Sequence, residues 1–366
     1  MKIKIIQRLS ALLLGLSPLL SHAEIKTIHD VLDRDISIDV PAQRVVLGFY
    51  AEDYMAIGGQ ESFEHVVGIS RATWEQWRPA SWTLYTNNNP KLKEIPDVGE
   101  VEAQTFSIEK VISLVPDVLV LADWQYQGLG SDIQRLESAG IKIIVVDYNA
   151  QTLRRHLAST RIIGKITGQE ERAQQIAHEY EAAISLIQQR LANIETKPKA
   201  YIEFGNKGPA EYSFTYGKNM WGAMLEMAGA ENIAAPYVEW WGPINPEQVI
   251  ASKPDVVFIA GTESSSAAGA MLMGENISPQ VARERLAGFV QRPGWSELPA
   301  VKTHRIYGIY QGASRSILDA SMIQYLAKAL YPDTFTDLNP EESYLAFYKK
   351  YLPVEPQGTF AIKLEE

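Results

Sequence analysis

An internal repeat constrains the fold of this chain more than any other feature of its sequence. Residues 107–122 align without gaps on residues 245–260, and seven of the sixteen positions are identical. Both copies contain Glu-x-Val-Ile followed by Pro-Asp-Val. The offset of 138 residues is far longer than the unit of a solenoid, so it indicates two duplicated lobes.

Each copy of the repeat is typical of a short helix followed by a buried strand. Ser107 and Asn245 are suitable N-caps, while Pro116 and Pro254 end the helices. The apolar runs at 118–122 and 256–260 do not alternate with polar residues, which predicts strands covered on both faces, as in parallel sheets packed by helices. Each lobe is therefore predicted to be α/β.

Other segments extend this α/β pattern along the chain. Strands are predicted at 45–47, 66–69, 143–146, 200–204 and 305–309. From 170 to 194, apolar residues recur at spacings of three and four, which predicts one long helix between the halves. We expect an N-terminal lobe at 24–168, a linking helix at 169–196 and a C-terminal lobe at 197–366, with a ligand cleft between the lobes.

Residues 1–23 have the pattern of a cleaved secretory signal peptide. Lys2, Lys4 and Arg8 precede an apolar run, 9–20, that is too short to span a membrane, and Ala23 provides a small residue for the cut. An uncleaved membrane anchor is the alternative. We expect the mature protein to be a monomer in a bacterial periplasm.

Composition and missing motifs exclude several functions. The chain has no cysteine, which excludes disulfides, cysteine metal sites and a thiol nucleophile. A net charge of -10 without a dense basic block argues against nucleic acid as a partner. Gly-x-Ser-x-Gly, the P-loop and His-Glu-x-x-His are absent, and the histidines are scattered. We expect no enzyme, no resident cofactor and no metal site; an exported hydrolase is the alternative of another class.

Several short motifs follow one another in a characteristic order. They are Arg44-Val-Val, Val66-Val-Gly-Ile-Ser70, Asp97-Val-Gly, the two repeats, Met227-Ala-Gly-Ala-Glu-Asn-Ile233 and Pro293-Gly-Trp-Ser-Glu-Leu-Pro-Ala-Val-Lys302. In this order they resemble the helix-linked periplasmic solute-binding proteins that deliver iron–siderophore complexes, cobalamin and related metal chelates to ABC importers. The resemblance implies two α/β lobes with parallel-rich sheets, joined by one long helix, and an inner-membrane permease as partner.

Residues that follow the predicted strands are the candidate ligand contacts, because ligands of parallel α/β sheets bind beyond the carboxyl ends of the strands. Seven of the eight tryptophans occur in segments expected to be loops there. Flat aromatic faces suit a bulky chelate, and arginines can bind its negative oxygens. The expected ligand-binding residues are Tyr50, Arg71, Trp74, Trp77, Trp82, Trp124, Tyr126, Tyr216, Trp240, Trp241, Tyr310 and Arg315.

Two alternatives stay open for these residues. Any single tryptophan can be a core residue instead, with Trp124, Trp240 and Trp241 favoured for the cleft, and a tyrosine of these loops can supply a phenolate to ferric iron. The expected ligand is a ferric siderophore; cobalamin or another corrinoid, haem and molybdate are alternatives within the same family. Arg71, Arg78, Arg292 and Arg315 are not ranked by the sequence.

Glu109 and Glu247 occupy matched positions in the two copies of the repeat. In the family, the glutamates at these motif positions dock onto arginines of the transporter, so the resemblance implies a transporter-docking role for both. An acid in the first turn of a helix is also favoured by the helix dipole, which is the alternative explanation.

Overall fold

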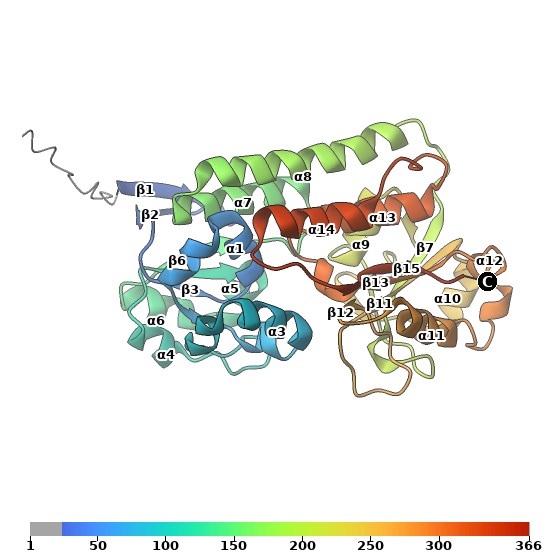
Figure 1. Ribbon diagram of the computed structural model, residues 1–366, viewed down its shortest axis with the longest axis horizontal. Coiled ribbons are helices and arrows are strands. Elements are labelled where there is room, and N and C mark those ends of the chain that lie inside the picture. The colour runs from blue at the N-terminus through green and yellow to red at the C-terminus, as the bar shows by residue number, and fades with distance from the viewer. Residues whose placement is uncertain (1–23, 366) are drawn as a thin grey trace, which may run out of the picture.

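The computed structural model describes residues 24–365, which form two α/β lobes bridged by a long helix (Figure 1). The expected signal peptide, 1–23, lies outside the described residues. Within the described part of the chain, no helix is long and apolar enough to cross a membrane.

The first lobe is built on a four-stranded sheet and an N-terminal hairpin. Its strands are β1 (Glu24–His29), β2 (Asp35–Val40), β3 (Val45–Leu47), β4 (Val66–Ile69), β5 (Val118–Ala122) and β6 (Lys142–Val146). Its helices are α1 (Ala51–Gly58), α2 (Ala72–Glu75), α3 (Pro79–Asn88), α4 (Ile108–Ser113), α5 (Asp123–Leu129), α6 (Asp132–Ser138) and α7 (Leu153–Thr167). The sheet order is β4-β3-β5-β6, and all neighbours are parallel.

The second lobe follows the long helix α8 (Glu170–Leu191). Its strands are β7 (Lys199–Phe204), β8 (Phe214–Tyr216), β9 (Glu231–Asn232), β10 (Trp241–Pro243), β11 (Val256–Gly261), β12 (Gly274–Glu275), β13 (Ile306–Tyr310), β14 (Gly358–Thr359) and β15 (Ala361–Lys363). Its helices are α9 (Trp221–Met227), α10 (Pro246–Ser252), α11 (Pro279–Phe289), α12 (Pro299–Lys302), α13 (Asp319–Leu330) and α14 (Pro340–Tyr351). The main sheet has the order β10-β8-β7-β11-β13-β15, with β9 beside β7.

The two copies of the repeat form equivalent helix–strand units. The strands β5 and β11 lie inside their sheets, are parallel to both neighbours, and are buried at every residue. Ser107 Oγ accepts a hydrogen bond from the Lys110 amide at 3.2 Å, and Asn245 Oδ1 accepts one from the Glu247 amide at 2.9 Å. The strands and caps predicted from the repeat are confirmed.

The predicted long helix is α8, which ends at Leu191, three residues before the expected end at 194. One face of α8 buries Ala173, Ile176, Tyr180, Ile184 and Ile187 at spacings of three and four. This face packs on α1 and α7 in the first lobe and on α13 and α9 in the second (Figure 1). Because the same apolar face of α8 packs on both lobes, this helix fixes the position of one lobe relative to the other.

The structure also contains antiparallel strands that the sequence did not predict. β8 and β10 extend one edge of the second sheet, β15 extends the other, and β1 pairs with β2 in a separate hairpin. β8, β10 and β15 have only three residues each, too few to show a hydrophobic period.

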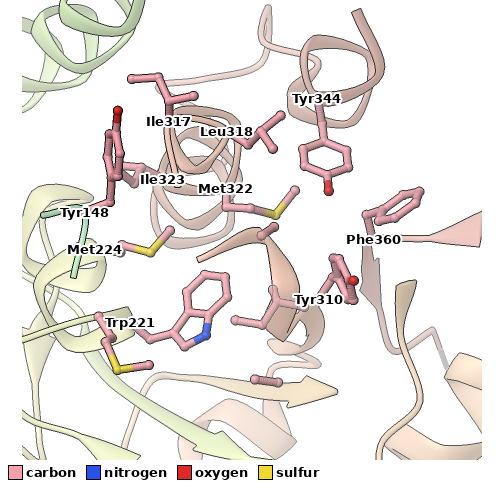
Figure 2. Packing of buried hydrophobic residues seen from close by; sticks show 14 of the residues in the cluster. Tyr148, Trp221, Met224, Tyr310, Ile317, Leu318, Met322, Ile323, Tyr344 and Phe360 are labelled. Carbon is pink, nitrogen blue, oxygen red and sulfur yellow. The ribbon is translucent and has the colours of Figure 1, made fainter. Parts of the chain in front are cut away.

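The hydrophobic core is continuous between the lobes. One cluster contains buried residues from both sheets and from α8, α13 and α14. Figure 2 shows Tyr148 of the first lobe beside Ile317 and Ile323 of the second, above Met224 and Trp221.

Buried carboxylates also cross the boundary between the lobes. Asp53 Oδ1, on α1, accepts hydrogen bonds from Ser316 Oγ at 2.8 Å and from the Ile317 amide at 2.7 Å. In the opposite direction, Glu263 Oε2 of the second lobe accepts from the amides of Ala80 and Ser81, at 2.7 and 3.1 Å, in the first turn of α3. These bonds fix the distance between the lobes at the base of the cleft.

The charge on Asp53 makes the stability of this contact dependent on pH. Burial raises the pKa of Asp53 to about 7, although the bonds from Ile317 and Ser316 favour the ionised form. The unfolded value is about 3.9, so the folded protein binds the proton more tightly. The stabilisation from this group is complete below about pH 4 and is lost as the pH rises to about 7.

We expect Asp53→Asn to be more stable than the wild type at about pH 8, because the amide oxygen still accepts both hydrogen bonds and carries no charge. The difference in Tm should shrink at about pH 5, where the wild-type carboxyl is protonated; thermal unfolding at the two values measures it. Asp337→Asn is the control: its pKa is lowered to about 2 by Arg190, so its difference from the wild type should stay constant over this range. A constant difference for Asp53→Asn would contradict the assignment.

Candidate functional site

Two adjoining cavities occupy the cleft between the lobes. The smaller, about 510 Å³, is lined by segments that follow β3, β4, β7, β11 and β13. The larger, about 960 Å³, is lined by segments that follow β5 and β6 and by β8 and the start of β10. Phe204, Gln311 and Arg315 line both cavities. The expected position of the site, beyond the carboxyl ends of parallel strands, is where these cavities lie.

The larger cavity has an aromatic wall. Trp240 and Trp241 are 62% and 47% exposed, and Trp241 stands edge-on to Phe214 with ring centroids 4.6 Å apart. On the facing lobe, Trp124 stands edge-on to Phe49 at 5.7 Å, and its buried indole Nε1 has no hydrogen-bond partner. Large exposed aromatic faces beside a cavity provide contact area for a flat or bulky ligand.

The smaller cavity is more polar. Tyr50, Trp74 and Trp77 lie on one side, and Ser264, Ser265 and Ser266 lie on the other. The serines belong to the stretch that directly follows β11.

Three of the tyrosines expected in the site are protonated phenols whose hydroxyls bind protein groups. Burial raises the pKa of Tyr50, Tyr216 and Tyr310 above the ordinary value. Their hydroxyls donate to Asn149, Gln311 and Glu263 at 2.9, 3.1 and 2.6 Å. Within residues 24–365, no group of three or more His, Asp or Glu is arranged to hold a metal ion.

Eight of the twelve expected ligand-binding residues line the cavities. They are Tyr50, Trp74 and Trp77 in the smaller cavity, Trp124, Tyr216, Trp240 and Trp241 in the larger, and Arg315 in both. Several stand on regular elements rather than in the expected loops: Trp74 is in α2, Trp124 is in α5, and Trp241 begins β10. Helices that start directly after a strand satisfy the backbone groups that a loop would leave open.

The structure places the other four expected residues away from both cavities. Trp82 is buried against Trp74, and Arg71 donates to the carbonyls of Lys93 and Ile95. The Arg34 guanidinium lies 4.4 Å from the centre of the Tyr126 ring, which also packs on a small hydrophobic cluster of the first lobe.

Tyr310 is the fourth. Its ring packs edge-on against Phe360, and its hydroxyl donates to Glu263. In each of the four cases, a protein partner already occupies the group that was expected to face a ligand.

The arginines that the sequence leaves unranked differ in their protein partners. Arg292 is buried and forms a bidentate pair with Glu203 at 2.7 and 3.0 Å, so it is a structural residue. Arg78 lines the smaller cavity and pairs with Glu52 at 2.7 Å. Arg315 makes no hydrogen bond or ion pair with any described residue, and its guanidinium lies 5.2 Å from the centre of the Phe49 ring.

Sequence reasoning missed a charged cluster in the larger cavity. Arg155 Nη1 donates to Asp123 Oδ2 at 2.7 Å and to Asp147 Oδ2 at 2.6 Å. Both acids directly follow a strand, so the rule used for the aromatics was sufficient to find them. Arg155 is in the first turn of α7, where no sequence signal marks it.

Glu109 and Glu247 are exposed at the second position of α4 and α10. Glu109 pairs with Arg135 at 2.9 Å, and this arginine also binds Asp132 at 2.8 Å. The hydrogen bond to its own backbone amide and the bond from Arg135 lower the pKa of Glu109, so it is ionised at neutral pH. Both glutamates are available at the surface.

Two α/β lobes, a linking helix and an aromatic cleft define a helix-linked solute-binding protein of the kind that serves ABC importers. The chain belongs to the periplasmic binding protein family, whose model matches residues 50–311. The TroA-like periplasmic binding protein FepB from Veillonella parvula has the same fold, with a TM-score of 0.87 and 32% identity over 93% of this chain and 99% of that one.

Two curated relatives are each 27% identical to the chain over the aligned residues. The uncharacterized ABC transporter substrate-binding lipoprotein YvrC of Bacillus subtilis strain 168 is 27% identical over 69% of this chain and 74% of its own length. The vitamin B12-binding protein of Salmonella typhi is 27% identical over 50% of this chain and 65% of its own length.

We expect Trp241→Ala to weaken binding of the expected ligand, a ferric siderophore, by about tenfold or more while leaving Tm nearly unchanged, because the ring is half-exposed at the cavity. Trp221→Ala is the matched contrast: this indole is fully buried, and its loss should cost about 3 to 5 kcal/mol of stability. Chelate titration and thermal unfolding of both variants measure the two effects. Unchanged affinity in Trp241→Ala would remove this residue from the site.

Proposed function

We propose that the protein captures a metal chelate, preferably a ferric siderophore, in the periplasm and delivers it to an inner-membrane ABC importer. The observation that carries the proposal is the pair of cavities between the lobes, walled by aromatic rings and by one arginine without a protein partner. The cleft binds and releases its ligand without breaking a bond. The expected signal peptide supports the periplasmic location.

A corrinoid is the second candidate ligand. It is favoured by the similarity to vitamin B12-binding proteins and by the size of the larger cavity, about 960 Å³. Haem and molybdate remain alternatives within the proposal, since solved structures of a haem-binding and a molybdate-binding protein share the fold at 21% and 18% identity. Molybdate, a small tetraoxoanion, would leave most of this aromatic surface without a contact.

The linking helix supports a binding cycle of small amplitude. The apolar face of α8 packs on both lobes, and the hydrophobic core continues between them. Ligand binding should therefore adjust loops and rotate the lobes slightly, without a wide hinge motion. We propose lobe limits at 24–168 and 197–366, on either side of the linking segment.

Native mass spectrometry of the protein purified from the periplasm, with titration of a chelate panel by tryptophan fluorescence, tests the function. We expect saturable binding of a ferric siderophore with one chelate per chain. Binding of corrinoid or haem alone would replace the preferred ligand. Absence of any chelate binding, together with enzyme-like turnover of ester, peptide or glycoside substrates, would overturn the function.

We also propose that Glu109 and Glu247 dock onto arginines of the permease, one glutamate to each half. We expect Glu109→Ala with Glu247→Ala to leave chelate affinity unchanged and to abolish uptake in cells that carry the cognate importer. The control removes two exposed glutamates elsewhere, Glu181→Ala with Glu284→Ala, and should keep wild-type uptake. Wild-type uptake by the folded docking variant would reduce both residues to helix-start acids.

A further inference from the structure

Most of the charged side chains that line the two cavities form ion pairs with one another. The smaller cavity has Glu52, Asp53 and Arg78, and the larger has Glu102, Asp123, Asp147 and Arg155; Arg315 lines both. Five carboxyl groups therefore face the ligand space together with three guanidinium groups.

Two of these guanidinium groups are already neutralised by the protein. Arg78 is paired with Glu52, and Arg155 is shared between Asp123 and Asp147. A ligand anion that recruited either arginine would leave a carboxylate unpaired in a partly buried wall, which is costly. Neither arginine is therefore available to an anionic ligand.

Arg315 is the exception. No described residue hydrogen-bonds to it, its buried Nε has no partner, and it lies at the boundary of the two cavities. Burial lowers the pKa of this guanidinium, and the charge of Glu102, which forms no hydrogen bond to it, offsets the lost hydration only in part. A single oxygen anion placed here would supply the missing bonds, and a guanidinium binds carboxylate or phosphate in a bidentate manner.

We propose that the cleft selects a metal chelate that is neutral overall or bears a single anionic group, that this anionic group binds at Arg315, and that triply anionic complexes are rejected. The inference rests on the proposed function and specifies its ligand class. A triply anionic complex would place two uncompensated charges against the carboxylates of the walls. A neutral chelate meets only the aromatic rings and the neutralised pairs.

Calorimetric titration with matched chelates tests the inference. The probes are a neutral ferric tris-hydroxamate, the same chelate bearing one added carboxylate, and a triply anionic ferric tris-catecholate. We expect the wild type to bind the neutral chelate about 100-fold more tightly than the triply anionic one, and the monocarboxylate about tenfold more tightly than the neutral one.

Two variants assign these preferences to residues. Arg315→Met keeps an unbranched side chain without charge, and it should bind the monocarboxylate and the neutral chelate with equal affinity. Asp123→Asn with Asp147→Asn frees Arg155 and should raise affinity for the triply anionic chelate about tenfold. Tm of each variant confirms that it is folded.

Failure of the proposed charge selectivity and failure of chelate capture give different results. Equal or tighter binding of the triply anionic chelate by the wild type, or an unchanged monocarboxylate preference in Arg315→Met, overturns the inference and leaves chelate capture intact. If none of the chelates binds, a corrinoid included, both the proposed function and the inference fail.

Discussion

One buried carboxylate joins the three parts of this molecule. Asp319, at the start of α13 in the second lobe, accepts a hydrogen bond from Tyr180 of the linking helix at 2.8 Å and lies 3.0 Å from His156 Nε2 of the first lobe. Burial opposes a positive charge on His156, but the charge of Asp319 and its hydrogen bond raise the pKa of the imidazole. Because removal of one member would leave a buried polar group unpaired, the triad fixes how the lobes meet.

The shape of the cleft depends on this contact between the two lobes and the linking helix. With the lobes held on the α8 side, the carboxyl ends of the strands of both sheets face the same space, and Asp53 and Glu263 bridge its base in opposite directions. Three of these four hydrogen bonds come from backbone amides, whose positions are set by α3 and by the turn before α13, and the fourth comes from the Ser316 hydroxyl. The geometry at the base of the cleft therefore depends on the ends of secondary-structure elements and on the two carboxylates that bind to them.

The sequence was sufficient for the parts of the fold that rest on local patterns. Non-alternating apolar runs predicted β5 and β11, and the three-to-four spacing predicted α8. Individual site residues were less predictable, because two residues that are adjacent in the sequence can make quite different tertiary contacts. Tyr310 packs on Phe360, whereas the next residue, Gln311, lines both cavities. The difference depends on Phe360, which lies between β14 and β15, fifty residues later in the chain, where no sequence signal marks the contact.

Electrostatics in the cleft is equally local. The net charge of -10 belongs mostly to surface residues, and at physiological salt their fields are screened over about 8 Å. Pairs such as Arg78–Glu52, with side chains largely shielded from water, are screened far less. The number of arginines near the cleft is thus a poor guide to its ligand. What counts is which guanidinium lacks a protein carboxylate, and only tertiary structure distinguishes Arg315 from Arg78 and Arg155 in that respect.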